Sequence, residues 1–251
     1  MVWPMTTFSG ATILITGAAS GIGLATARWL AGAGAAKLVL VDVDAAALDA
    51  VDLPCPVIRL AGSVADEAFW AAADLTGLTH AVVNAGVAGA GAIADLSFAE
   101  WRRIMAVNLD GAFLTLRAAL RAIGNGGAIV AVASAAGIKA EAGVAAYGAS
   151  KAALIHLVKV AAKEAAARGI RVNAIAPAGV ETPVWDAVPM FAERAAAIGR
   201  DAAFAELAQL ATPLGRYAKA DEIAAQIGWL LSDAAALITG TTLVSDGGYT
   251  L

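Results

Sequence analysis

Residues 11–23 read ATILITGAASGIG, an apolar stretch that runs directly into a glycine-rich turn. The first six of these residues predict a buried strand, and the pattern from residue 22 onward predicts a helix. Gly17, Gly21 and Gly23 permit the tight turn and let backbone N–H groups approach an anion at the positive end of the helix. The stretch therefore predicts a strand–turn–helix unit that binds a phosphate group, although an ordinary strand–helix turn is the alternative.

An acidic residue follows the glycine turn at the distance that a dinucleotide site needs. Asp42 directly follows the second apolar run, residues 37–41, and lies about 20 residues past Gly23. Its carboxylate can accept hydrogen bonds from the adenosine ribose hydroxyls, and its charge repels a 2′-phosphate. Neither Val43 nor the alanines of the turn offer a cation there. The sequence thus predicts NAD as the cofactor and disfavours NADP, whereas Asp42 taken alone could be a solvated loop acid.

Five further apolar runs alternate with helical patterns along the chain. The strands expected after the first two are residues 56–60, 80–83, 128–133, 170–175 and 241–245. The expected helices are residues 22–33, 44–50, 66–75, 98–123, 145–167 and 220–231. Because most strand runs are continuously apolar, the strands should be buried on both faces. The expected fold class is α/β: one Rossmann-fold domain over residues 1–251, with a doubly wound, seven-stranded parallel sheet and helices on both faces.

Composition excludes several classes of protein. The 251 residues suit one domain, and 60% hydrophobic with 15% charged residues excludes a disordered chain. A net charge of −4 gives no basic excess for nucleic acid. The single cysteine, Cys55, fits a reducing compartment, and no His/Cys/Asp cluster has metal-ligand spacing, so no metal is expected.

Hydropathy raises the question of a membrane segment. Mean hydropathy is +0.73, and residues 1–27 carry no charge. A secretory signal needs Lys or Arg near its start, and a spanning helix needs about 20 mostly apolar residues, whereas Pro4 and several glycines interrupt this run. We expect a cytoplasmic protein without a membrane partner, in which alanine-rich helices around a buried sheet account for the hydropathy.

One segment interrupts the alternation of strands and helices. Residues 181–214 lie between a predicted strand and the helix at residue 220, and they carry many large apolar side chains. Long excursions at the carboxyl edge of such a sheet are commonly functional. A mobile apolar substrate lid is expected here, and a helical hairpin that covers the core is the alternative.

Tyr147 and Lys151 lie four residues apart in a predicted helix and therefore share one face. A nearby ammonium favours a phenolate, so Lys151 is expected to lower the Tyr147 pKa from its usual value of about 10. Such a tyrosine can take a proton from an alcohol or return one to a ketone. Ser134 ends the preceding strand, where its hydroxyl can bind the substrate oxygen. Each residue alone is unremarkable, but together with a dinucleotide turn they indicate an active site.

These motifs together resemble the short-chain dehydrogenase/reductase family over essentially the whole chain. The matching residues are Thr16-Gly17-x-x-x-Gly21-x-Gly23, Asn84-Ala85-Gly86, Asn108, Ser134, Tyr147-x-x-x-Lys151 and Asp246-Gly247-Gly248. The resemblance implies that Tyr147 is the general acid/base, that Ser134 polarises the substrate oxygen, and that Lys151 binds the nicotinamide ribose. It also implies that Asn108 holds a water that links Lys151 to solvent. Family members are commonly homotetramers, paired here through residues 98–123 and 145–167.

The resemblance also implies which residues contact each ligand. The cofactor residues are expected to be Gly17, Ser20, Gly21, Ile22, Gly23, Asp42, Val43, Ser63, Val64, Asn84, Ala85, Gly86, Tyr147, Lys151, Pro177, Val180 and Thr182. The substrate residues are expected to be Ser134, Val144, Tyr147 and Trp185, with lid packing as the alternative role of Trp185. The chain departs from the family at Pro177-Ala178-Gly179, where Pro-Gly is usual, at Ser63-Val64, where Asp-Val is common, and at Val83, where Asn is usual.

The expected activity is hydride transfer between NAD(H) and a hydrophobic secondary alcohol or ketone. Within the family, the alternatives are a 3-oxoacyl reductase, whose usual NADPH preference Asp42 disfavours, and a cis-dihydrodiol dehydrogenase. A non-catalytic NAD-binding regulator is the alternative from another class. Such proteins tend to lose the tyrosine or the lysine, and both are present here.

Overall fold

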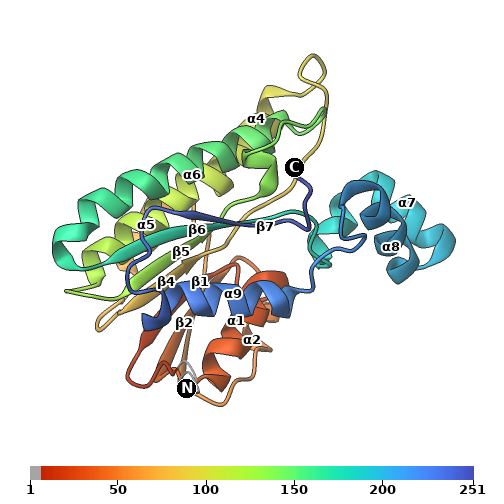
Figure 1. Ribbon diagram of the computed structural model, residues 1–251. Helices are drawn as coiled ribbons and strands as arrows, with labels where there is room; N and C mark the ends of the chain where they lie inside the picture. The colour runs from red at the N-terminus through yellow and green to blue at the C-terminus, as the bar shows by residue number, and fades with distance from the viewer. Residues whose placement is uncertain (1–6) are drawn as a thin grey trace.

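A parallel sheet forms the centre of the protein in this computed structural model, which describes residues 7–251 (Figure 1). The first six residues of the uncharged N-terminal run lie outside the described residues. The seven strands pair in the order β3-β2-β1-β4-β5-β6-β7, and every pair is parallel. They are β1 (Thr12–Thr16), β2 (Lys37–Asp42), β3 (Val57–Ala61), β4 (His80–Val83), β5 (Ala128–Val132), β6 (Arg171–Pro177) and β7 (Thr242–Ser245). The predicted fold class is confirmed.

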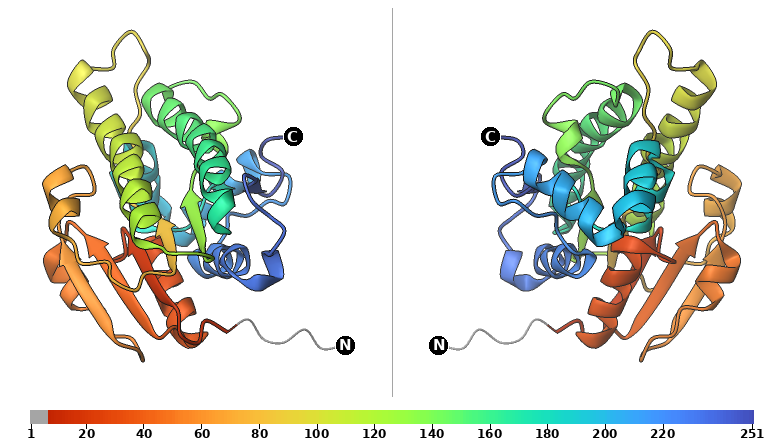
Figure 2. Two further views of the ribbon diagram at one scale, coloured as in Figure 1. Left: turned by 90° about the vertical axis from the view of Figure 1, so that its left-hand side faces the viewer. Right: turned by 90° about the vertical axis from the view of Figure 1, so that its right-hand side faces the viewer.

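Helices cover both faces of the sheet, as the two side views show (Figure 2). One layer holds α1 (Gly21–Gly32), α2 (Ala45–Asp49) and α9 (Ala220–Leu231). The other holds α3 (Glu67–Ala72), α4 (Phe98–Met105), α5 (Gly111–Ala122) and α6 (Ala145–Ala165). Successive residues of β1 enter different cores, Leu14 on the side of α5 and α6, and Ile13 and Ile15 on the side of α1 and α9. This alternation explains why the strand sequences are apolar throughout.

The helix predicted over residues 98–123 is not one regular helix, so this expectation is wrong in detail. A π-helical turn, η1 (Ala106–Asp110), separates α4 from α5. It contains Asn108, whose side chain is fully buried and hydrogen-bonded to the loop after β4. Hydrophobic periodicity does not register one widened turn, whereas such turns are frequent at functional sites.

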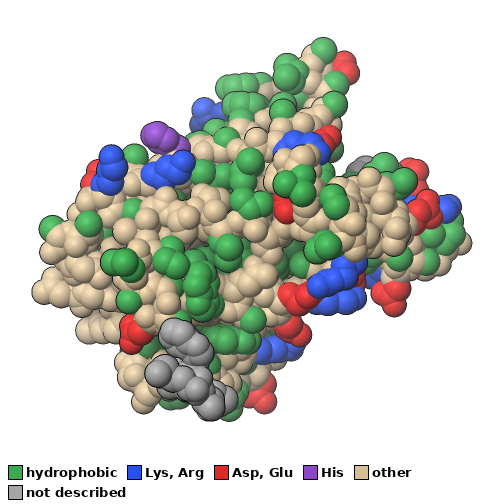
Figure 3. Space-filling model, in the orientation of Figure 1, with side chains coloured by type: hydrophobic (Ala, Val, Ile, Leu, Met, Phe, Trp, Pro, Cys, Tyr) green, Lys and Arg blue, Asp and Glu red, His purple; other side chains and the backbone are tan. Residues whose placement is uncertain are grey.

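Residues 181–214 form a helical hairpin beyond the carboxyl end of the sheet (Figure 1). It comprises η4 (Pro183–Ala187), α7 (Pro189–Ile198) and α8 (Arg200–Ala211). Phe191 and Phe204 are buried with Tyr217 in a small aromatic core that is separate from the two cores of the sheet. Basic and acidic side chains lie side by side where the hairpin joins the body (Figure 3). The ion pairs Arg216–Glu222 and Lys219–Glu181 form just after the hairpin and just before it. The hairpin is thus a distinct packing unit, and its mobility stays a prediction.

Within residues 7–251, no helix combines the length and the apolar character that crossing a bilayer requires.

Candidate active site

A cavity of about 840 Å³ opens beyond the carboxyl ends of the parallel strands. Gly17, Asp42, Asn84 and Ser134 reach it from the ends of β1, β2, β4 and β5. The strand order reverses between β1 and β4, which is where ligands bind in doubly wound sheets. All the predicted site residues line this cavity except Gly23 and Asn108.

The glycine turn leaves the N-terminus of α1 open to an anion. Gly17 and Gly21 have φ values of +64° and +51°, which side chains rarely tolerate. A Cβ at Gly23 would collide with the carbonyl oxygen of Gly17, so this glycine packs the helix against the turn instead of lining the cavity. The N-cap residue Ser20 makes no side-chain cap bond, and the first turn carries no acid. The turn therefore fits the pyrophosphate of a dinucleotide.

Asp42 orders the turn as well as facing the cavity. Its two carboxylate oxygens accept hydrogen bonds from the backbone N–H of Ala19 (2.9 Å) and of Asp44 (3.1 Å). Among residues 7–251, the cations that line the cavity are Arg103 and Lys151. Arg103 is paired with Glu100, and Lys151 lies with Tyr147. A phosphate beside Asp42 would therefore meet a carboxylate without a compensating cation.

Asn84 joins the ends of two strands. Its side chain donates to the carbonyl oxygens of Thr16 (2.9 Å) and Gly17 (3.2 Å). The buried Thr16 hydroxyl in turn accepts from the N–H groups of Asn84 and Ala85. These bonds fix the floor of the cavity at the β1–β4 junction and explain why polar side chains are needed there.

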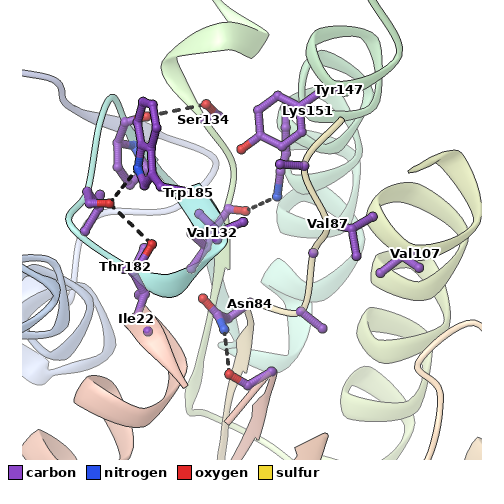
Figure 4. Close-up of a pocket in the computed structure, with 18 of the residues that line it drawn as sticks. Ile22, Asn84, Val87, Val107, Val132, Ser134, Tyr147, Lys151, Thr182 and Trp185 are labelled. Carbon is purple, nitrogen blue, oxygen red and sulfur yellow. Dashed lines mark hydrogen bonds between the residues drawn. The ribbon is translucent and has the colours of Figure 1, made fainter. Parts of the chain in front are cut away.

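Lys151 reaches the cavity from α6, as Tyr147 does, and Ser134 faces them from the end of β5 (Figure 4). Lys151 is only 4% exposed, and its ammonium donates to the Val132 carbonyl at 2.8 Å and lies 5.8 Å from the centre of the Tyr147 ring. Burial lowers the pKa of Lys151 to about 8. Burial also raises the pKa of Tyr147, and the Ser134 hydroxyl offsets only part of that rise. The direction is opposite to the lowering that was expected from Lys151, because desolvation of the phenol is the largest cause of the shift.

Asn108 lies behind the cavity wall and not on its surface. Its side chain accepts from the Val87 N–H (2.8 Å) and donates to the Val87 carbonyl (3.0 Å) and the Ser150 hydroxyl (3.2 Å). The Ser150 hydroxyl in turn donates a hydrogen bond to the Tyr147 carbonyl (2.7 Å). Asn108 thus connects the loop after β4 to the helix that carries Tyr147, and the water relay stays a prediction.

The loop after β6 bends over the glycine turn. A Cβ at Gly21 would come within 3.4 Å of Thr182, so this loop and the turn are in contact range. Thr182 and Trp185 both donate to the Val180 carbonyl, at 3.3 and 2.9 Å. In the departure Pro177-Ala178-Gly179, a side chain at Gly179 would overlap the ring of Tyr217, so the displaced glycine is required by packing.

Trp185 both lines the cavity and packs within the hairpin segment. It faces Tyr147 across the cavity (Figure 4) and also stacks on Tyr217, with ring centres 5.5 Å apart and planes inclined by 24°. Val144 lines the same region. Ser63 accepts from the Ala65 N–H in the turn before α3, which leaves its contact with a cofactor a prediction.

Several cavity residues were missed by sequence reasoning. They include Val87, Val107, Ala211, Tyr217 and Tyr249. Val107 immediately precedes Asn108, and Tyr249 follows the Asp246-Gly247-Gly248 motif, so position relative to a motif was an available signal for both. Tyr217 has no such signal, because its place depends on the packing of the hairpin.

Comparisons with known proteins agree with this geometry. A family model described as "Enoyl-(Acyl carrier protein) reductase" matches residues 17–250. Cis-4-hydroxycyclohexanecarboxylate dehydrogenase of Sinomonas cyclohexanicum is 37% identical, over 97% of this chain and 98% of its own. A short-chain type dehydrogenase/reductase of Mycobacterium marinum superposes with a TM-score of 0.87 at 32% identity, covering 98% of each chain. The 3-ketoacyl-(acyl-carrier-protein) reductase of Brucella melitensis, solved with NADH, has a TM-score of 0.86 at 28% identity, covering 98% of this chain and 100% of its own.

The fold and the site define an oxidoreductase that binds a nicotinamide dinucleotide beyond the carboxyl edge of a doubly wound sheet. The chain belongs to the short-chain dehydrogenase/reductase family, as its motifs predicted.

Proposed function

We propose that the protein is an NAD-dependent dehydrogenase that interconverts a hydrophobic secondary alcohol and its ketone. The observation that carries the proposal is the juxtaposition of Ser134, Tyr147 and Lys151 on one cavity with the glycine turn. A bound nicotinamide supplies the hydride acceptor or donor. The residues of the chain then have to bind the substrate oxygen, move one proton and exclude water.

Each of the three side chains has one task in this proposal. The Ser134 hydroxyl donates to the substrate oxygen and orients it. The Tyr147 phenolate takes the alcohol proton during oxidation, and the protonated phenol gives it back during reduction. The Lys151 ammonium, fixed on the Val132 carbonyl, stabilises negative charge as the phenol loses its proton and binds ribose hydroxyls.

Asp42 favours NAD over NADP. A 2′-phosphate beside it would place two like charges together, and neither Ser20 nor Val43 supplies a positive charge there. The structural relative from Brucella melitensis was solved with NADH, which is consistent with this choice.

The substrate end of the cavity is mainly apolar, which favours a hydrophobic substrate. Val144, Trp185, Val188 and Ala211 line it. The relative from Sinomonas cyclohexanicum is named for a hydroxylated six-membered ring, so ring alcohols are the first class to test. The proposed lid motion of residues 181–214 predicts reduced hydrogen exchange in this segment when NADH and a ketone bind, and unchanged exchange would contradict it.

Absorbance at 340 nm tests the proposal directly. Purified protein receives NAD with cyclohexanol and other secondary alcohols, or NADH with the matching ketones, and each assay is repeated with the phosphorylated cofactor. Turnover with NAD(H), lost in Tyr147→Phe, supports the proposal. Turnover confined to NADPH with 3-oxoacyl thioesters would favour the reductase alternative. Binding of NADH without any turnover would favour the regulator, and absence of binding would contradict the cofactor site.

We also infer that the protein is a homotetramer paired through α4, α5 and α6. Phe98, Phe113 and Val160 are exposed on these helices and would be covered in such an assembly. Light scattering is expected to give the mass of four 25.0-kDa chains. Phe113→Asp should reduce that mass, and a monomeric wild-type protein would contradict the inference.

A further inference from the structure

Two phenols besides Tyr147 line the cavity, and neither takes part in the proposed proton transfer. Tyr217 follows the α7–α8 hairpin, and Tyr249 lies in the C-terminal tail. The two elements are distant in the sequence from the helix that carries Tyr147. The proposed proton transfer therefore does not explain why Tyr217 and Tyr249 line the same cavity as Tyr147.

Tyr217 is rigidly placed but its hydroxyl is not used by the protein. The ring stacks on Trp185 and covers the backbone of Gly179, and the residue is only 8% exposed. Among residues 7–251, its hydroxyl has no hydrogen-bond partner. Burial raises the pKa of Tyr217, so the phenol stays neutral at physiological pH and keeps its proton to donate.

Two separate sets of contacts hold Tyr249 in place. Asp246 accepts from the N–H groups of Gly248 (2.9 Å) and Thr250 (2.8 Å) and from the Thr250 hydroxyl (2.6 Å), which folds the tail. The Lys139 ammonium donates to the Tyr249 carbonyl at 2.8 Å and lies 4.4 Å from the centre of its ring. The C-terminal tail is thus bound to the loop that contains Lys139, and the Tyr249 ring lines the cavity.

Charges of both signs lie near Tyr249, the Lys139 ammonium and the Glu141 carboxylate. Burial and then the Glu141 carboxylate raise the pKa of Tyr249, so this phenol also stays protonated. A neutral phenol can accept a hydrogen bond on its oxygen from a hydroxyl of another molecule, as well as donate one. The opposite charges of Lys139 and Glu141 offer a ligand carboxylate no net positive charge here, so a neutral hydroxyl or carbonyl fits the place better.

We propose that Tyr217 and Tyr249 form a second polar anchor for a neutral oxygen function of the substrate, remote from the carbon that is oxidised. The substrate class is then a diol or a hydroxyketone on an otherwise apolar frame. Tyr217 donates to this oxygen, and Tyr249 accepts from it when it is a hydroxyl. Both tyrosines are positioning residues, and the inference rests on the proposed alcohol dehydrogenase function.

The test compares substrates that differ in one oxygen. The ratio of kcat/KM for the best of the 1,2-, 1,3- and 1,4-cyclohexanediols to kcat/KM for cyclohexanol is measured with NAD for the wild type, Tyr217→Phe and Tyr249→Phe. We expect a wild-type ratio of about tenfold or more, and a fall of about 2- to 12-fold in each variant, the range of one hydrogen bond. A purely structural role would lower both kcat/KM values together and leave the ratio unchanged.

Thr242→Val is the matched control. It also removes one hydroxyl at nearly constant shape, and Thr242 lies on β7 and does not line the cavity. Its diol ratio should equal that of the wild type.

The outcomes separate this inference from the function on which it rests. Oxidation of cyclohexanol with no diol preference, or a preference kept in both phenylalanine variants, would overturn the anchor alone. A wild-type preference for 4-hydroxycyclohexanecarboxylate over every diol would overturn the inference that the anchor binds a neutral oxygen function. Absence of turnover with every ring alcohol and every other secondary alcohol or ketone of the 340 nm assay would refute the proposed function and the anchor with it.

Discussion

The ammonium of Lys151 is bound to the carbonyl oxygen of Val132, 2.8 Å away, at the last residue of strand β5, which lies next to the central strand β4. Only 4% of the lysine is exposed, and burial lowers its pKa to about 8. At neutral pH the protein therefore keeps a cation in a place that destabilises it. Active sites commonly retain such unfavourable groups because the reaction needs them.

Lys151→Met is expected to stabilise the protein and abolish activity. The pKa difference between 10.5 in the unfolded chain and about 8 in the fold corresponds to about 3 kcal/mol at neutral pH. Below pH 8 the lysine is charged in both states, so the full penalty applies. Between pH 8 and 10.5 the unfolded chain binds the additional proton, and the wild type gains stability as the pH rises.

Denaturant unfolding at several pH values measures this effect. The free energy of unfolding of Lys151→Met should exceed that of the wild type most at pH 7. This difference should shrink as the pH rises from 8 to 10.5. A variant that is less stable at pH 7 would contradict the prediction.

Tyr147→Phe is expected to lower kcat by roughly 10²- to 10⁴-fold, the usual contribution of a general acid/base. NADH affinity, measured by fluorescence titration, should change little because the ring remains. Activity within tenfold of the wild type would show that another group moves the proton.

The raised pKa of Tyr147 also sets the direction of the pH dependence. Alcohol oxidation needs the deprotonated phenol, so its kcat/KM should rise from pH 7 towards alkaline pH. Ketone reduction needs the protonated phenol and should fall over the same range. Initial rates of alcohol oxidation and of ketone reduction, each measured against pH, test this prediction. If both rates changed in the same direction with pH, Tyr147 would not be the general acid/base.

Asp42→Asn is expected to weaken the discrimination against NADP by about tenfold, or about 1.4 kcal/mol. The amide oxygen can still accept from the Ala19 N–H, so the glycine turn should persist. The measured quantity is the ratio of kcat/KM with NAD to that with NADP. Asp44→Asn removes a neighbouring carboxylate that does not line the cavity, and its ratio should not change.

Gly179→Ala is expected to destabilise the protein by about 1–3 kcal/mol, because the new methyl group overlaps the Tyr217 ring. Gly32→Ala in α1 is the control with the opposite sign. No atom lies within 4 Å of its added Cβ, so the helix should gain about 0.5–1 kcal/mol. Thermal unfolding of both variants measures the contrast, and equal melting temperatures would refute the packing role of Gly179.

Most of the fold and the central part of the site were predictable from sequence because they depend on local patterns. The seven apolar runs coincide with the seven strands to within about two residues. The glycine turn, Asp42 and the Tyr147–Lys151 pair are all short-range signals. Their meeting on one cavity follows from the parallel topology, which brings the carboxyl ends of the strands to one edge.

Contacts between distant segments decided the rest. The π-helical turn at Asn108 arises where its side chain binds Val87, and no periodicity in the helix records that bond. The direction of the Tyr147 pKa depends on burial by the whole fold. Tyr249 is held at the cavity by a hydrogen bond from Lys139, which lies 110 residues earlier in the chain. The sequence by itself determined the order of strands and helices, the dinucleotide turn and the family. Only the tertiary structure decided which further side chains close the substrate end, because desolvation and long-range packing exist only once the chain has folded.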